Sequence, residues 1–215
     1  MRFIAPLDGA GGGSWLAVNE RGLSIGLLNG YRNTDPPEGP AEGFRSRGLL
    51  PVSLIDSASI DEVALRLRRM ELGGFRSFEI LAMQRGDEVL LARWSGRELT
   101  TRTPAGGASP LVSSSFDTSA VRASRESLYR RIVGDGGEER LERHRAYHRC
   151  HHPGRGPYSP CMHRPDAKTV SFSHVAVTGE RVCFHYLPHS PCRSETDAST
   201  VCLSRQPDAR VPDRQ

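Results

Sequence analysis

Histidine and cysteine side chains, which could bind a metal ion, gather in the last third of the chain. Imidazole nitrogens and thiolate sulfurs are the ligands that zinc takes in tetrahedral protein sites. His144 and His148 stand four residues apart, so they would share one face of a helix. The full set comprises His144, His148, Cys150, His151, His152, Cys161 and His163.

The spacing of this set fits no standard zinc module, because it contains no Cys-x-x-Cys pair. We therefore predict a solvated basic segment here and no metal site. Cys161, Met162 and His163 could also serve as soft ligands for a bound group. Residues of these types at the start of a strand are more typical of packing and hydrogen bonding, so we expect no cofactor.

Two short apolar runs near the N-terminus predict the β-hairpin around which the rest of the chain is built. They span residues 15–18 and 23–28, with turn-forming residues 19–22 between them and Asn29-Gly30 after them. Three of the hairpin residues are glycines, which have no Cβ. This pattern predicts that the hairpin lies in a buried sheet against which another segment packs closely.

Hydrophobic periodicity and capping residues predict the other elements. Ser59 and Glu62 form a capping box before apolar residues at helical spacing, which predicts an amphipathic helix over 59–72. A second helix is predicted over 118–133 and a short exposed one over 138–148. The predicted strands span 78–83, 89–94, 98–102, 169–177, 181–186 and 200–203.

This order of elements contains hairpins throughout and no βαβ pattern, which favours the α+β class with helices on the faces of antiparallel sheets. Residues 32–48 are rich in proline and glycine and predict a surface loop that could act as a lid over a site. We expect one domain over residues 1–203, followed by a polar tail over 204–215.

Composition excludes several classes of protein. The net charge is +4, but acidic and basic residues are interleaved and no nucleic-acid motif is present, so we expect no nucleic-acid partner. No window approaches the roughly 18 apolar residues that a membrane helix needs, and no signal peptide is visible. We expect a cytoplasmic protein without a membrane span. The odd number of cysteines, five, does not indicate a disulfide framework.

The hairpin carries a resemblance to known proteins. Asn-Glu-Arg-Gly-Leu at 19–23 and Leu-Asn-Gly-Tyr at 28–31 resemble a hairpin of the transport and Golgi organisation protein 2 family, also called the NRDE family. They also resemble the choloylglycine-hydrolase branch of the N-terminal-nucleophile hydrolases. Ser46-Arg47-Gly48 and residues 161–171 are similar to NRDE motifs, the latter to those of bacterial members. The resemblance implies a four-layer αββα sandwich of antiparallel sheets that lacks its first strands.

The resemblance implies particular site residues. In the hydrolase branch the asparagine that closes the second strand, here Asn29, helps to form the oxyanion hole. Ser114 stands where many relatives have an asparagine that binds the substrate carbonyl, and a hydroxyl offers one donor where an amide offers two. We expect Arg47 or Arg164 to hold an anionic substrate. The other expected substrate-binding residues are Trp15, Asn19, Tyr31 and His163.

The resemblance also implies a nucleophile that these residues do not supply. N-terminal-nucleophile hydrolases attack with a first-residue Cys, Ser or Thr whose own α-amine is the base. NRDE members begin Met-Cys and carry Asn-Arg-Asp-Glu soon after, whereas here Met1 is followed by Arg2. Residues 1–6 resemble a stretch some dozens of residues into the family pattern, so we expect that this sequence begins late. Cleavage before Ser14 would expose a hydroxyl, but Ser14 stands at the head of a strand.

The sequence therefore leaves two functions open for an NRDE protein that handles a small molecule and whose activity is undetermined. One is hydrolysis of an amide or acyl bond, with Asn29 stabilising the oxyanion and a nucleophile encoded upstream of Met1. The other is non-catalytic binding of a small molecule such as haem or an acyl lipid.

Overall fold

The computed structural model describes residues 1–9, 11–31, 43–84, 88–104, 110–134, 140–193 and 196–206. The larger sheet is antiparallel, in the order β1 (Phe3–Ile4), β2 (Leu16–Asn19), β3 (Ser24–Asn29), β4 (Phe78–Gln84), β5 (Glu88–Trp94) and β6 (Leu99–Arg102). The smaller sheet comprises β7 (Phe172–Val177), β8 (Arg181–Leu187) and β9 (Ser199–Ser204). The α-helices are α1 (Leu49–Leu54), α2 (Ile60–Arg69), α3 (Thr118–Ile132) and α4 (Arg140–Arg149).

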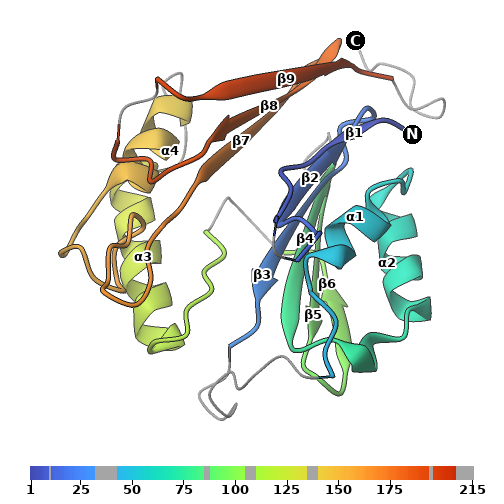
Figure 1. Ribbon diagram of the computed structural model, residues 1–215, viewed down its shortest axis with the longest axis horizontal. Helices are drawn as coiled ribbons and strands as arrows, with labels where there is room; N and C mark the ends of the chain where they lie inside the picture. Colours follow the sequence, from blue (N-terminus) through green and yellow to red (C-terminus); the bar gives the residue numbers. More distant parts are fainter. Residues whose placement is uncertain are drawn as a thin grey trace.

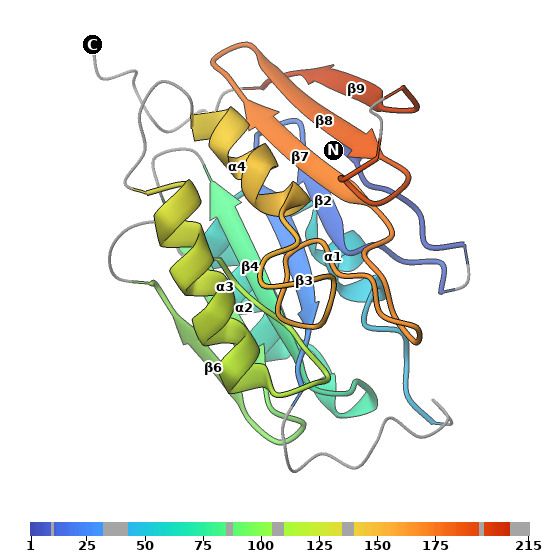
Figure 2. The same cartoon turned by 90° about the vertical axis from the view of Figure 1, so that its left-hand side faces the viewer.

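The two sheets lie between two pairs of helices. Figure 1 shows α1 and α2 against the outer face of the larger sheet, whereas α3 and α4 lie on the opposite side of the molecule, with the smaller sheet. Figure 2 shows the same arrangement from the side of α3 and α4, with the larger sheet behind them. The predicted α+β fold with antiparallel sheets is therefore confirmed.

Strand alternation on β2 explains how one sheet serves two hydrophobic clusters. Side chains of neighbouring strand residues point to opposite faces. Ala17 joins the cluster under α1 and α2, which is the main core, and Val18 joins a cluster with Val182 and Phe184 of the smaller sheet. All four side chains are buried. Contact between the sheets therefore depends on the inner face of β2 and on β8.

The predicted elements agree with most of the observed ones. The hairpin, the three strands after it and the long helix are confirmed, and Ser59 caps α2 by accepting from the Glu62 amide at 3.3 Å. The prediction of an exposed helix over 138–148 is partly wrong, because Tyr147 of α4 is buried against Tyr129 of α3. Helix α1 was not predicted; Pro51 in its first turn is tolerated there because that amide has no helical partner.

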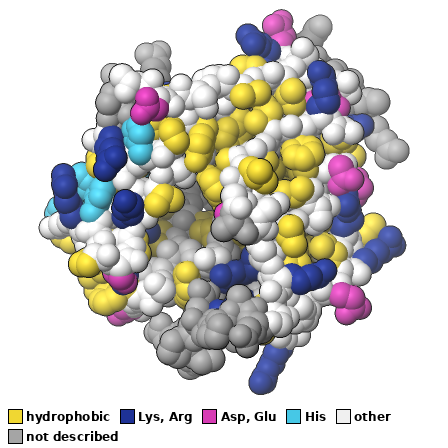
Figure 3. Space-filling view, viewed as in Figure 1, with side chains coloured by type: hydrophobic (Ala, Val, Ile, Leu, Met, Phe, Trp, Pro, Cys, Tyr) yellow, Lys and Arg dark blue, Asp and Glu magenta, His cyan; other side chains and the backbone are white. Residues whose placement is uncertain are grey.

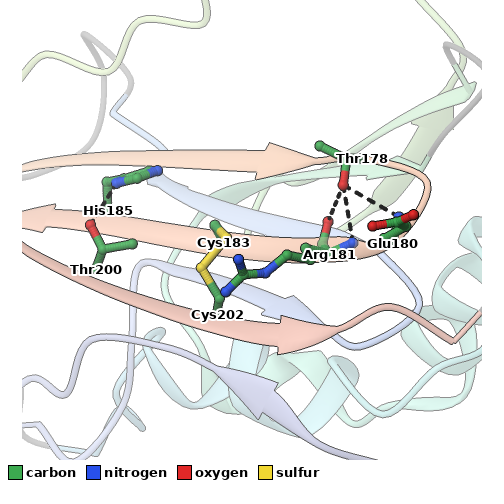
Figure 4. Close-up of a disulfide and its surroundings, with 7 residues drawn as sticks. All are labelled: Thr178, Glu180, Arg181, Cys183, His185, Thr200 and Cys202. Atoms are coloured by element: carbon green, nitrogen blue, oxygen red, sulfur yellow. Dashed lines mark hydrogen bonds between the residues drawn. A yellow bond between two sulfur atoms is a disulfide. The ribbon is translucent and has the colours of Figure 1, made fainter.

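A disulfide joins the central strand of the smaller sheet to one of its edge strands. Cys183 of β8 and Cys202 of β9 are cross-strand partners, and their sulfurs are bonded. Figure 4 shows the bond between the strands, with His185 and Thr200 hydrogen-bonded on one side and the Thr178 turn on the other. Sequence spacing did not predict this pair, because strand register brings together residues that are 19 apart.

The C-terminal end of the described chain is bound to the larger sheet's hairpin. Beyond β9, the amide of Gln206 donates to the carbonyl of Glu20 at 2.8 Å, and that of Arg205 donates to Glu180 at 2.7 Å. The rest of the predicted tail, and most of the predicted lid over 32–48, lie outside the described residues. No helix among the described residues is long and apolar enough to cross a membrane.

We predict that Phe184→Ala lowers the free energy of unfolding by about 3–4 kcal/mol, because it removes a buried ring from between the sheets. Its cross-strand partner Val201 provides the matched control, since it lies on the same sheet but is 52% exposed. Val201→Ala should change the free energy by less than about 0.5 kcal/mol. Urea denaturation measures both, and equal losses would contradict this account of the sheet contact.

Candidate functional site

A cavity of about 600 Å³ lies beside the end of β3, where the first hairpin meets the segment before α1. Figure 3 shows that this face of the molecule is hollowed between its two halves, with basic side chains along the lower edge of the hollow. The described residues that line the cavity are Asp8, Ser14, Trp15, Leu27, Asn29, Phe44, Arg45, Ser46, Arg47, Gly48 and Arg76.

Two glycines let the backbone of this segment touch the hairpin. A Cβ on Gly13 would lie only 2.2 Å from the carbonyl carbon of Gly48, so no other residue fits at position 13 without backbone movement. The Ser14 amide donates to the Gly48 carbonyl at 2.8 Å across this contact. Arg47, which directly precedes Gly48, is therefore held next to the open end of the hairpin.

The carbonyl of Ser77 fixes Arg47 relative to the end of β3. It accepts from the Arg47 guanidinium, through Nη1, at 3.0 Å and from the Gly30 amide at 3.0 Å. A Cβ on Gly30 would lie 2.8 Å from the carbonyl carbon of Ser77, so this approach also requires glycine. Arg47 and Asn29, which precedes Gly30, thus have a defined separation in one wall of the cavity.

Asn29 contributes to two neighbouring cavities. Its side-chain amide Nδ2 donates to the Tyr31 hydroxyl at 3.2 Å, and its backbone carbonyl accepts from the Ser113 hydroxyl at 2.6 Å. A smaller cavity of about 160 Å³ lies on the other side, next to the start of α3. Its described lining is Asn29, Gly30, Tyr31, Ser77, Phe78, Glu79, Arg93, Trp94, Val112, Ser113, Ser114, Thr118 and Arg122.

The polar groups of the smaller cavity are mostly engaged with neighbouring protein groups. The Ser114 hydroxyl accepts from the Phe116 amide at 3.2 Å, and Arg93 donates to the Glu79 carboxylate at 2.7 Å. Asp117 caps α3 by accepting from the Ala120 amide, which lowers the pKa of its carboxyl group. These contacts stabilise the walls, so the larger cavity is the better candidate for a ligand.

Positive charge dominates the described lining of the larger cavity. Arg45, Arg47 and Arg76 lie there with one carboxylate, that of Asp8. The Arg45 guanidinium lies 4.1 Å from the centre of the Phe75 ring, and that of Arg76 lies 5.3 Å from Phe44. Aromatic faces attract such cations and hold them in place. Arg47 is predicted from its motif, whereas Arg45 and Arg76 belong to no recognisable motif and could not be predicted.

The structure brings together five of the predicted site residues. Trp15, Asn29 and Arg47 line the larger cavity, and Tyr31 and Ser114 lie with Asn29 in the lining of the smaller one. The Trp15 ring also contacts Tyr186 of β8, with 6.2 Å between ring centres. The larger cavity is therefore coupled to the smaller sheet through Trp15.

Asn19 lies away from both cavities, inside the protein. Its Nδ2 donates to the carbonyls of Ile55 and Ser57 at 2.8 and 3.0 Å. Its Oδ1 accepts from the amides of Arg21 and Leu23 at 3.0 and 3.2 Å. The side chain is fully buried. We do not propose that Asn19 binds substrate, because its side-chain amide already links the hairpin turn to the end of α1 through these hydrogen bonds.

His163 and Arg164 belong to the connection between α4 and β7 and do not appear among the described lining residues of either cavity. Arg164 forms an ion pair with Asp166, which lowers the pKa of that carboxyl group, and its guanidinium lies 6.0 Å from the centre of the Phe116 ring. The anion-binding role expected for Arg47 or Arg164 is therefore better matched by Arg47.

Among the described lining residues of the larger cavity, no hydroxyl is paired with a side chain that could act as its base. The Ser14 hydroxyl donates to the Leu16 carbonyl at 2.9 Å, and no histidine or cysteine is among the described lining residues. Cys161 is buried elsewhere, where burial and a hydrogen bond with Cys192 raise the pKa of its thiol to about 11. A protonated thiol is a poor nucleophile.

Metal-binding side chains gather at another place in the described chain. His151, Cys161, His163 and Cys192 carry ligand atoms that all lie within 4.8 Å of one another. Three of these residues belong to the set noted in the sequence, whereas Cys192 was not considered because it lies 29 residues beyond His163.

Comparison with known proteins finds a matching protein family. A family model described as Transport and Golgi organisation 2 matches residues 1–129, which contain every described lining residue of both cavities. No curated protein matches the chain. The resemblance inferred from residues 161–171 lies beyond the matched region and stays a prediction.

Asn19 and Asn29 provide a matched pair of substitutions. Asn19→Ala should lower the free energy of unfolding by about 3 kcal/mol, because it leaves buried carbonyl and amide groups without partners. Asn29→Ala removes an amide at a cavity wall and should cost less than about 1 kcal/mol. Urea denaturation of both variants measures the difference. A larger loss for Asn29→Ala would show that the two roles are reversed.

Proposed function

Because this chain belongs to the Transport and Golgi organisation 2 family, we propose that its larger cavity binds a small molecule with an acyl or amide carbonyl and a negative charge. The observation that carries the proposal is the pairing of Asn29 and Arg47 at fixed positions in one wall. An amide group recognises a carbonyl, and a guanidinium recognises a carboxylate or phosphate.

Carbonyl recognition is assigned to Asn29. Its Nδ2 carries two N–H groups, and the Tyr31 hydroxyl accepts from one of them. The other is the donor that we assign to the ligand's carbonyl oxygen. Packing of Gly30 against Ser77 restrains the end of β3, so the donor is held before the ligand arrives. Such preorganisation reduces the entropy lost on binding.

Recognition of the negative charge is assigned to the arginines, above all to Arg47, which is bound to the same Ser77 carbonyl as the Gly30 amide. Three guanidinium groups and one carboxylate among the described lining residues leave this cavity attractive to anions. Trp15, Leu27 and Phe44 supply apolar surface for a short acyl chain. The volume of about 600 Å³ suits a small molecule.

Haem is a poorer fit to this cavity. Haem iron takes an axial ligand such as histidine, cysteine, methionine or tyrosine. None of these residue types is among the described lining residues of the larger cavity. The ligand class that we retain from the two sequence-based alternatives is therefore the acyl or amide compound.

Hydrolysis of the bound carbonyl is the second candidate function. It is favoured by the expected role of Asn29, because a donor aimed at a developing oxyanion is worth about 3 kcal/mol of transition-state stabilisation. It also needs a nucleophile and a base, which the described lining residues do not combine. Binding is therefore the primary proposal, and hydrolysis is measured in the same experiment.

N-hexanoylglycine and its methyl ester are suitable probes, since both carry the amide and only the acid carries the charge. We predict that Asn29→Ala weakens the binding of both probes about tenfold, which corresponds to one lost hydrogen bond. Arg47→Leu should weaken binding of the acid by a similar factor and leave that of the ester unchanged. Isothermal titration calorimetry measures these affinities.

Arg102→Leu is the matched control for Arg47→Leu, since Arg102 is an exposed residue of β6 that lines neither cavity. Binding of the acid should not change in this variant. Release of glycine, lost in Asn29→Ala, would support the second candidate function. Equal affinities of the wild-type protein and both cavity variants for the acid would overturn the proposal.

A further inference from the structure

Four potential metal ligands converge from three separate segments of the C-terminal part of the chain. His151 follows α4, Cys161 and His163 lie in the connection to β7, and Cys192 lies in the turn after β8. Their ligand atoms all lie within 4.8 Å of one another. These residues lie outside both cavities and beyond the region matched by the family model.

Two sulfur–nitrogen distances within the group match those between the ligands of one tetrahedral ion. The sulfurs of Cys161 and Cys192 each lie 3.4 Å from Nε2 of His163. With metal–sulfur and metal–nitrogen bonds of about 2.3 and 2.0 Å, tetrahedral geometry separates neighbouring sulfur and nitrogen ligands by roughly 3.5 Å. The observed separations therefore need little adjustment to accommodate an ion.

One hydrogen bond at Nε2 of His163 cannot serve both cysteine sulfurs at once. An imidazole nitrogen has either one proton or one lone pair in the ring plane, so Nε2 of His163 has one good hydrogen-bonding direction. Two sulfurs approach it at equal distance. A cation at the centre of the group would satisfy both sulfurs and the nitrogen together.

A second, independent observation concerns His151. Its Nε2 atom is buried and has no hydrogen-bond partner. The ring lies 5.2 Å from that of His163, centre to centre, in an edge-to-face arrangement. A buried polar atom without a partner is uncommon in native proteins and calls for an explanation such as an ion.

The backbone around the group is already ordered by hydrogen bonds. The amide of Cys161 donates to the Cys150 carbonyl at 3.1 Å, and that of His163 donates to Arg155 at 3.0 Å. The buried Ser159 hydroxyl lies 3.0 Å from the Cys161 carbonyl. These contacts hold two of the ligands in place, which reduces the entropy lost when an ion binds.

We propose that His151, Cys161, His163 and Cys192 bind one zinc ion in a tetrahedral Cys₂His₂ site. Two thiolates and two imidazoles are typical of zinc, and four protein ligands leave no open position for a substrate. The ion is therefore structural. It joins the residue that follows α4 to the connection before β7 and to the turn after β8. This proposal replaces the sequence-based expectation of a solvated segment without metal.

Zinc content of the purified full-length chain tests the proposal directly. After dialysis in the presence of a phosphine reductant, elemental analysis should find about one zinc ion per chain. Cys192→Ser removes a ligand at an exposed position and should lower the content at least tenfold. Cys150→Ser is the matched control, because it removes a free thiol whose sulfur is not in the group, and it should retain the ion.

Cobalt substitution distinguishes a bound ion from a contaminant and from a cysteine pair. Cobalt in a tetrahedral site with thiolates gives intense visible bands and sulfur-to-metal charge transfer, which Cys192→Ser should weaken and His151→Gln should shift. Far-UV circular dichroism checks that the variants are folded. The proposal is overturned if the reduced wild-type chain contains no zinc and gives no cobalt spectrum. It is equally overturned if folded Cys192→Ser retains the zinc of the wild type.

Discussion

Close backbone contact at two glycines is the constraint on which the candidate site depends. Gly13 touches Gly48, and Gly30 touches Ser77, at distances that leave no room for a Cβ. The hairpin end and the segment before α1 can therefore lie directly against each other. Because the Ser77 carbonyl accepts from both Gly30 and Arg47, the same contacts that close the fold also fix a guanidinium beside Asn29.

The residues up to 129 and the residues after them contribute differently to this site. The region matched by the family model, residues 1–129, contains the described lining of both cavities. The later residues add the smaller sheet and the ligand-rich connection before it. Phe116 joins these two parts, since its ring lies 5.9 Å from that of Tyr158 and 6.0 Å from the Arg164 guanidinium. A structural ion in that connection would therefore stiffen the segment that packs beside the start of α3.

Local sequence signals predicted the elements, whereas contacts between distant segments decided the site. Apolar periodicity and the Ser59 cap were sufficient for the hairpin and α2, because both depend on neighbours along the chain. The family resemblance indicated Asn29 and Arg47. Nothing local distinguishes Arg45 and Arg76 from other surface arginines, and Cys192 joins its group only through the fold. The structural role of Asn19 was not predicted, because a buried amide and a ligand-binding amide look alike in a sequence.

The central claim is that Asn29 and Arg47 contact the same ligand in the larger cavity. Nitrogen-15 NMR of their side chains during titration with N-hexanoylglycine tests it most directly. We predict that the Asn29 Nδ2 and Arg47 Nε resonances shift together and saturate at one ligand concentration, while those of buried Asn19 stay in place. Saturable shifts elsewhere, with both of these side chains unaffected, would contradict it.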